Sequence, residues 1–239
     1  MERTAARYDD IVDFYLGVVG EDAGDAVATT LLGLVGDVRG LRVLDLACGS
    51  GRVTRALAGR GAAVVGADIS DAMLARARAA EAAEPLGIAY LHADVPSAGA
   101  LAGETFDAVV CNHGLADIDD LEGTLATVAR VLRPGGPFVF SLVHPCFPGW
   151  DDTAPSSWPR DGGYHAEGWW LAVNPGIRGK VGSNHRKLST YLNGAVRHNL
   201  AIEEVAEPVP EPRVLARQQA AQPGAGPLPM FLVVRCRAT

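Results

Sequence analysis

Two short features of the sequence carry the first indications of chemistry. Positions 45–51 read DLACGSG, between an apolar run and a helical pattern. Glycines at such a turn let backbone N–H groups come close to a ligand that a Cβ would exclude, and the N-terminus of the following helix favours anions. Two glycines alone are weak evidence, so a tight turn with no ligand is the alternative.

Asp68 strengthens the ligand interpretation. It ends the next apolar run, near the spacing at which an acid accepts hydrogen bonds from the two hydroxyls of a ribose. We therefore expect an adenosine-type ligand. NAD is not the best candidate, because the dinucleotide fingerprint has a third glycine where this chain has Thr54.

The elements that position these residues are strands alternating with helices. Short apolar runs predict strands at 41–47, 63–70, 88–92, 106–111 and 138–143. Ser70 is an expected N-cap for a helix over 71–83, and RPGG at 133–136 ends a helix over 121–132. This alternation predicts right-handed crossovers and an open, mostly parallel α/β sheet over residues 41–143.

The segments on either side of that sheet have other patterns. Apolar spacing predicts two helices within 5–36, and residues 144–186 form an insertion rich in proline, glycine and aromatic residues. A helix is expected near 187–198, with Asn199 as a left-handed cap. Two further strands, 200–207 and 230–236, are expected to pair antiparallel at the sheet edge, joined by a proline-interrupted loop over 208–228.

Composition excludes several classes of protein. The chain has 239 residues, 48% of them hydrophobic and 21% charged, and a net charge of −7. These values are typical of a globular protein, and the scattered basic residues do not predict nucleic-acid binding. No apolar stretch is long enough to span a membrane, and the four cysteines form no C-x-x-C pair. We expect a cytoplasmic protein with no nucleic-acid or membrane partner, and histidine and acidic residues show no metal-ligand spacing.

In order along the chain, VLDLACGSG, the acid in GADIS, LHADV and LRPGG resemble the class I S-adenosylmethionine (SAM)-dependent methyltransferases over residues 41–143. The resemblance implies a Rossmann-like fold: an open, mostly parallel seven-stranded sheet with helices on both faces, N-terminal helices and a lid insertion after the fifth strand. It implies one methyltransferase domain over 1–239, comprising a helical cap (1–40), the SAM-binding core (41–143), the insertion (144–186) and a C-terminal helix and strand pair (187–239). SAM would be the cofactor and S-adenosylhomocysteine (SAH) its product.

The same resemblance implies a role for each residue of a SAM site. The methionine end would be lined by Asp45, Ala47, Gly49 and Gly51, with Asn112 and His113 below it. The ribose would be held by Asp68, and the adenine would pack on Ile69 and Met73 with its edge at Asp94 and Val95. Tyr8 would lie in a helix that closes over SAM.

The acceptor of the methyl group is expected to meet aromatic residues of the insertion. All four tryptophans lie between positions 150 and 170, and aromatic side chains offer contact area and stabilise a cation such as a sulfonium. We interpret this segment as a lid, and a small satellite core is the alternative. The candidate substrate-binding residues are Trp150, Tyr164, Trp169, Arg186 and Tyr191.

Two histidines are candidate general bases. His144 follows the fifth expected strand, and His185 lies in an Asn-His-Arg segment that resembles a group of small-molecule methyltransferases. Methylation of a hydroxyl calls for a proton acceptor, and an imidazole has a suitable pKa. The alternative is that both histidines hydrogen-bond only to neighbouring loops.

The sequence thus predicts a methyltransferase that transfers a methyl group by SN2 displacement to an oxygen, or to a nitrogen or carbon, of a small molecule. The alternative function is a SAM-binding enzyme that uses the cofactor without methyl transfer, for instance in a cyclisation. The acceptor and the oligomeric state stay open at this stage.

Overall fold

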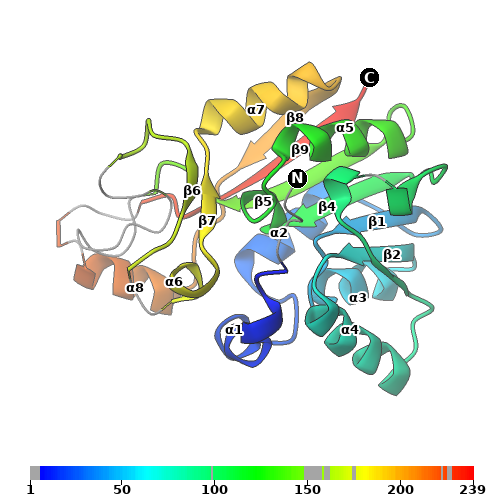
Figure 1. Ribbon diagram of the computed structural model, residues 1–239, viewed down its shortest axis with the longest axis horizontal. Helices are drawn as coiled ribbons and strands as arrows, with labels where there is room; N and C mark the ends of the chain where they lie inside the picture. The colour runs from blue at the N-terminus through cyan, green and yellow to red at the C-terminus, as the bar shows by residue number, and fades with distance from the viewer. Residues whose placement is uncertain are drawn as a thin grey trace.

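Seven strands form one sheet in the order β3-β2-β1-β4-β5-β9-β8 (Figure 1). The computed structural model describes residues 6–97, 99–147, 158, 162–173, 176–221, 223–224 and 228–239. The strands are β1 (Arg42–Leu46), β2 (Ala63–Asp68), β3 (Ala89–His92), β4 (Ala108–Asn112), β5 (Pro137–Val143), β8 (Leu200–Ala206) and β9 (Phe231–Ala238). The first five are parallel, and β9 pairs antiparallel with both β5 and β8. The predicted mostly parallel seven-stranded sheet is confirmed, as is the antiparallel pair at its edge.

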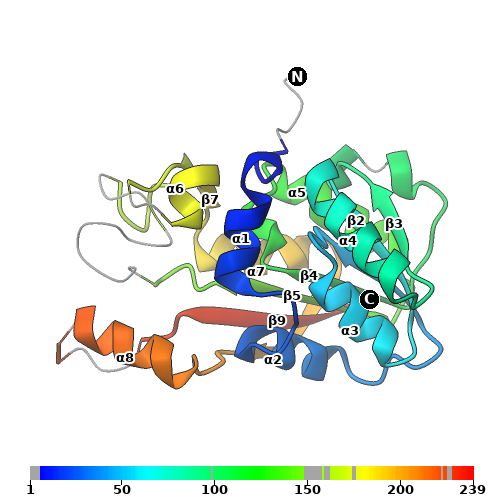
Figure 2. The ribbon, with the colours of Figure 1, turned by 90° about the horizontal axis from the view of Figure 1, so that it is seen from below.

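Helices cover both faces of this sheet. They are α1 (Val12–Val19), α2 (Ala26–Val35), α3 (Arg52–Gly59), α4 (Asp71–Ala83), α5 (Leu121–Val131), α6 (Ile177–Val181), α7 (Leu188–Arg197) and α8 (Pro212–Ala221). Buried residues of α2 and α3 pack with one face of the strands, and those of α5 and α7 pack with the other (Figure 2). The helices predicted near 5–36, 71–83, 121–132 and 187–198 are therefore confirmed.

The alternation of side chains along each strand explains why its sequence is a continuous apolar run. In β1, Leu44 and Leu46 belong to the core on the α5 and α7 side, whereas Val43 belongs to the core on the α2 and α3 side. In β5, Phe140 and Val139 divide between the two cores in the same way. Both faces of a parallel sheet are buried, so both sets of side chains must be apolar.

Polar caps set the ends of the helices that lead into the site. The Ser70 side chain accepts a hydrogen bond from the Met73 N–H at 3.1 Å, which confirms the predicted N-cap of α4. Asp25 caps α2 by accepting from the N–H groups of Val27 and Ala28. Asn199, between α7 and β8, has φ 57°, so the predicted left-handed cap is also confirmed.

One predicted loop contains a helix. Residues 208–228 were expected to be irregular because of their prolines, yet α8 begins at Pro212. Proline is well tolerated in the first turn of a helix, where its missing N–H would have no intrahelical partner. This proline therefore begins a helix instead of interrupting a segment.

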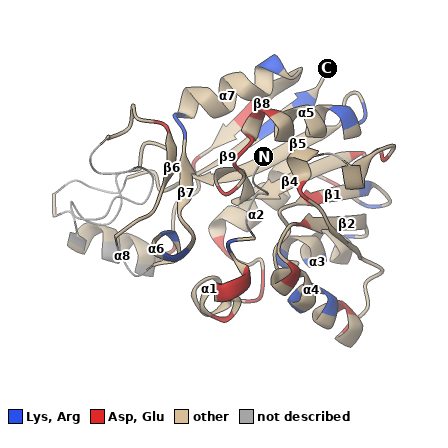
Figure 3. Cartoon of the chain, in the orientation of Figure 1, with Lys and Arg blue, Asp and Glu red and all other residues tan. Residues whose placement is uncertain are grey.

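The insertion after β5 carries regular elements of its own. Strands β6 (Gly168–Trp170) and β7 (Ser183–His185) pair antiparallel, and α6 lies between them in the chain. Figure 3 shows basic residues on several elements, including α4, α6 and α7, rather than gathered on one. No helix within the described residues has the length and apolar character needed to cross a membrane.

Candidate functional site

A cavity of about 820 Å³ lies at the carboxyl ends of the parallel strands. Loops after β1, β2, β3 and β4 form one part of its wall, and residues of α1, α2, α8, β5 and β9 form another. Ligands of open α/β sheets bind at this edge. Ten of the residues predicted to bind SAM line the cavity: Tyr8, Ala47, Gly49, Asp68, Ile69, Met73, Asp94, Val95, Asn112 and His113.

The glycine turn after β1 has the open backbone that its sequence predicts. Ala47 and Gly49 have φ 54° and 55°, and Gly51, the N-cap of α3, has φ 86°. A Cβ on Gly51 would lie 2.4 Å from the hydroxyl oxygen of Tyr90, so any other residue would be strained at this φ and would have to displace the Tyr90 side chain. Gly51 itself is absent from the cavity wall; it shapes the turn that brings Gly49 to the cavity.

Asp68 joins the end of β2 to this turn. Its Oδ2 accepts a hydrogen bond from the Gly49 N–H at 2.7 Å, and its Oδ1 accepts from the Ser70 N–H at 2.8 Å. Burial raises the pKa of Asp68, and these backbone hydrogen bonds oppose that rise. Each carboxylate oxygen can accept more than one hydrogen bond, so a fixed carboxylate at the cavity still has capacity for two ribose hydroxyls.

Asp45 lies behind the turn and lines a small adjoining cavity of about 40 Å³ together with Gly49. Its Oδ2 accepts a hydrogen bond from the Thr54 hydroxyl at 2.6 Å, whereas its Oδ1 is buried with no hydrogen-bond partner. Burial raises the pKa of Asp45 to about 7. Thr54 stands where a dinucleotide fingerprint has its third glycine, and a glycine there could not make this hydrogen bond.

These features fit SAM. The orphaned oxygen of Asp45 is suited to a positively charged group such as the methionine ammonium, and Asp68 is suited to the ribose. Ile69, Met73 and Val95 offer apolar surface beyond Asp68 for the adenine. When bound, SAM supplies an activated methyl group on a sulfonium; the residues of this chain hold and orient it.

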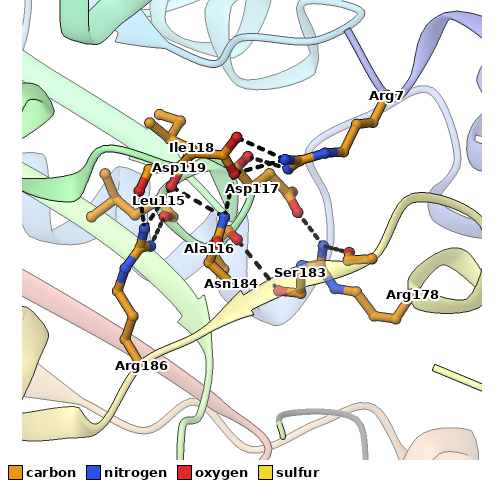
Figure 4. A network of polar contacts seen from close by, with 11 residues as sticks. Arg7, Leu115, Ala116, Asp117, Ile118, Asp119, Arg178, Ser183, Asn184 and Arg186 are labelled. Atoms are coloured by element: carbon orange, nitrogen blue, oxygen red, sulfur yellow. Dashed lines mark hydrogen bonds and ion pairs between the residues drawn. The ribbon is translucent and has the colours of Figure 1, made fainter. Parts of the chain in front are cut away.

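A network of arginines and acids joins the loop after β4 to α6 and β7 (Figure 4), and its members Arg7, Asp117 and Arg178 line the cavity. Asp117, in the loop after β4, accepts a hydrogen bond from the Tyr8 hydroxyl at 2.9 Å and forms an ion pair with Arg178 of α6. Burial, followed by the nearby charge of Asp117, raises the pKa of Tyr8. Tyr8 and Arg178 both line the cavity. Through Asp117, the segment before α1 and helix α6 therefore meet at the loop after β4.

Arg186 and Arg7 also hold this loop; Arg7 lines the cavity. Arg186 donates to the carbonyl oxygens of Leu115, Ile118 and Asp119 at 2.7–2.9 Å, and Arg7 forms an ion pair with Asp119 at 2.7 Å. Arg186 was predicted to bind substrate. Its guanidinium instead occupies backbone carbonyls, and the residue is absent from the cavity wall.

The other predicted substrate residues also lie away from the cavity. Tyr191 is buried in the core between α7 and the sheet, and the Tyr164 hydroxyl accepts from the Leu188 N–H at 3.0 Å. Trp169 is 53% exposed on β6. Trp150 lies outside the described residues. The structure therefore does not bring the predicted aromatic residues that it describes onto the cavity wall.

Both candidate bases are buried and engaged elsewhere. The Nε2 of His144 lies 3.1 Å from a carboxylate oxygen of Glu207, and its Nδ1 accepts from the Cys146 N–H at 3.1 Å. His185 is 1% exposed, and its Nε2 donates to the carbonyl oxygen of Tyr164 at 2.8 Å. Neither residue lines the cavity, so we assign neither as the base.

Part of the wall was missed by reasoning from the sequence. Arg178, Met230 and Phe231 lie outside the segment that resembles the methyltransferases, and nothing in their spacing marks them. Asp25, another residue of the cavity wall, could have been placed at the start of a helix from the sequence, because an acid directly before an apolar helical pattern is a typical N-cap.

Comparison with known proteins agrees with this site. Residues 44–140 match the family described as "Methyltransferase domain". The crystal structure of a SAM-dependent methyltransferase from Mesorhizobium loti is 33% identical, with a TM-score of 0.69, covering 90% of this chain and 98% of that one. The chain therefore belongs to the SAM-dependent methyltransferases, and SAM is its cofactor.

Curated relatives match over a shorter stretch. A "Ubiquinone biosynthesis O-methyltransferase" from Hahella chejuensis is 34% identical over 105 residues, which cover 44% of each protein. A "Demethylmenaquinone methyltransferase" from Clavibacter sepedonicus is 37% identical over 142 residues, covering 57% of this chain and 56% of the relative. The chain thus spans about half the length of these curated relatives.

Proposed function

We propose that this protein transfers the methyl group of SAM to a small, largely apolar molecule bound in the same cavity. The observation that carries the proposal is the division of the cavity wall across the sheet. Residues suited to SAM follow β1, β2 and β3, whereas apolar residues from β5 and β9, which lie beyond β4 in the sheet, and from α1, α2 and α8 line the rest of the wall. These are Val18, Val19, Val27, Val143, Val214, Met230 and Phe231.

The sheet register supports this arrangement of the two halves. Val143 at the end of β5 pairs with Phe231 at the start of β9, so both side chains reach the same edge of the sheet. Apolar walls with few polar groups are typical of sites for small organic molecules. The names of the two curated relatives, which refer to ubiquinone biosynthesis and demethylmenaquinone, agree with an acceptor of this kind.

Charged groups in the apolar half already have partners. Asp25 caps α2 and forms an ion pair with Arg52 at 2.9 Å, and Glu211 accepts from the Ala26 N–H at 3.2 Å. An ionised acceptor would have to displace one of these contacts to gain a counter-charge. A neutral acceptor needs no such exchange, and this supports an uncharged molecule.

The contribution of the chain to catalysis would be alignment and exclusion of water. Holding the acceptor atom in line with the methyl group makes the reaction effectively unimolecular, and such positioning lowers the barrier by several kcal/mol. The contacts of Tyr8 and Arg178 with Asp117 would hold these three residues of the cavity wall in place. Asp68 would fix the cofactor through its ribose.

Isothermal titration with SAM, SAH and NADH tests the proposal. We expect SAM and SAH to bind, NADH not to bind, and Asp68→Asn to weaken SAH binding at least about tenfold, because the amide loses acceptor capacity. Glu204→Gln, a similar change at an exposed position of β8, is the matched control and should bind SAH normally. NADH binding without SAH binding would contradict the proposal.

A second assay separates methyl transfer from other uses of SAM. We expect release of SAH when the protein is incubated with SAM and a panel of small apolar phenols and amines. An enzyme that bound SAM and converted an acceptor without releasing SAH would instead be a non-methylating one.

A further inference from the structure

We propose that His113 accepts the proton of the methyl acceptor, and that this acceptor is an apolar ring that carries a hydroxyl group. The inference rests on the proposed function and adds to it the acceptor class and the residue that meets the reacting oxygen. It assigns to His113 a contact with the acceptor in place of the purely cofactor-binding role that the family resemblance implies.

The position of His113 in the sheet is the first argument. In the strand order, β4 lies between β1, which carries the glycine turn, and β5, which carries Val143. His113 is the first residue after β4 and lines the cavity. Its side chain therefore lies at the boundary between the SAM half and the apolar half, where a transferred methyl group has to cross.

The imidazole ring is the second argument. Among the described residues, none hydrogen-bonds either ring nitrogen of His113: Nδ1 is enclosed by protein without a partner, and Nε2 is not enclosed. The ring centroid lies 5.5 Å from that of Phe231, which belongs to the apolar half. By contrast, His144 and His185 have ring nitrogens bonded within the protein. His113 thus offers an unused nitrogen next to an aromatic surface.

The backbone around His113 is held in an uncommon conformation. Its φ of 60° and ψ of 0° are left-handed, which residues other than glycine rarely adopt. The His113 N–H donates to the Ser141 hydroxyl at 3.0 Å, and that hydroxyl donates to Oδ1 of Asn112 at 2.7 Å. Such strain persists where surrounding contacts enforce it, and it is concentrated at functional sites.

The charge state of the ring agrees with this role. Burial, reinforced by Arg178 and Arg52, lowers the pKa of His113 to about 4, and Asp25 only partly opposes the shift. The ring is therefore neutral near pH 7 and able to accept a hydrogen bond from a hydroxyl. A ring that was already protonated could not take up the proton.

The reaction balances with this assignment. The acceptor oxygen forms a bond to the methyl carbon as the sulfur–carbon bond of SAM breaks, and the electron pair of that bond stays on sulfur to give SAH. The hydroxyl proton passes to Nε2 of His113, which later releases it to solvent. Oxygen that gains a methyl group while it still holds its proton becomes strongly acidic, so even a weakly basic imidazole suffices.

Binding of two matched probes to the SAH complex tests the hydroxyl contact. 2-Naphthol carries a hydroxyl, and 2-methoxynaphthalene has a methyl ether in its place. We expect 2-naphthol to bind about tenfold more tightly, since the ether cannot donate to the ring. His113→Gly should abolish this preference without backbone strain, because glycine readily adopts φ 60°. Equal binding of the two probes to the native protein, or an unchanged preference in the variant, would refute the proposal.

Turnover gives the second measurement. We expect His113→Gly to lower kcat for 2-naphthol about 100-fold or more, and added imidazole to restore part of that activity. Imidazole should not restore the activity of His113→Asn, because the asparagine side chain occupies the space that imidazole would fill. An unchanged kcat in His113→Gly would overturn the assignment. Titration with SAH is the control: it should bind the variants within about threefold of the native protein. Failure of SAH to bind the native protein would overturn the proposed function instead.

Discussion

Asp45→Asn is predicted to stabilise the protein at alkaline pH. Burial raises the pKa of Asp45 from 3.8 to about 7, a rise that corresponds to about 4 kcal/mol. Because the pKa is higher in the folded state, the favourable contribution is complete at low pH and is lost as pH rises through 7. Asparagine keeps the volume and can still accept from Thr54, but it cannot ionise. The variant should therefore gain stability over the native protein by about 2 kcal/mol between pH 5.5 and 8.5.

Urea unfolding, followed by tryptophan fluorescence across this pH range, measures the difference. Asp107→Asn is the matched control: a backbone hydrogen bond from Arg42 and the neighbouring arginines lower the pKa of Asp107, so its effect should be destabilising and nearly constant above pH 5.5. The reasoning fails if the curves for Asp45→Asn and the native protein run parallel. A carboxylate that keeps an ordinary pKa in the folded state would give that result.

Two further substitutions test the loop after β4. Gly114→Ala should lower the free energy of unfolding by about 2 kcal/mol or more, because the new Cβ would lie 2.4 Å from the Cβ of Ala47. The control is Gly33→Ala, on an open face of α2, which should be neutral or stabilising in the same urea assay. Arg178→Met should lower the free energy of unfolding by about 2 kcal/mol, because it leaves Asp117 without its ion pair. Adding Asp117→Asn to this variant should recover much of that loss. If the effects of the two substitutions on the free energy of unfolding were strictly additive, a direct coupling between the two residues would be contradicted.

Much of the sheet can be predicted from the sequence because the apolar runs, the glycine turn and the helix caps all indicate the same elements. The run around Leu44 is apolar at every position since both faces of β1 are covered, and the turn after it requires glycine at Gly51. The caps at Ser70 and Asn199 depend on neighbours within a few residues, so they can be read locally. The helix beginning at Pro212 was missed because the same proline signal serves a helix start and a loop.

The site divides in a similar way. Most of the cofactor half comes from one continuous segment whose spacing is informative, and ten predicted residues, Tyr8 among them, reach the cavity wall. The acceptor half joins α1, α2, α8 and β9, which no spacing in the sequence relates to one another. His144 illustrates the limit: a histidine at a strand end can turn toward the cavity or toward Glu207, and tertiary packing decides.

The division of the cavity also bears on how such a protein diversifies. Residues 44–140, which match the family, include the glycine turn and Asp68, whereas Val18, Val143 and Phe231 of the acceptor half lie outside that match. Substitutions in the flanking segments would therefore reshape the proposed acceptor half and leave the glycine turn and Asp68 unchanged. Descendants of one ancestor could retain the same recognisable central segment and still act on different molecules.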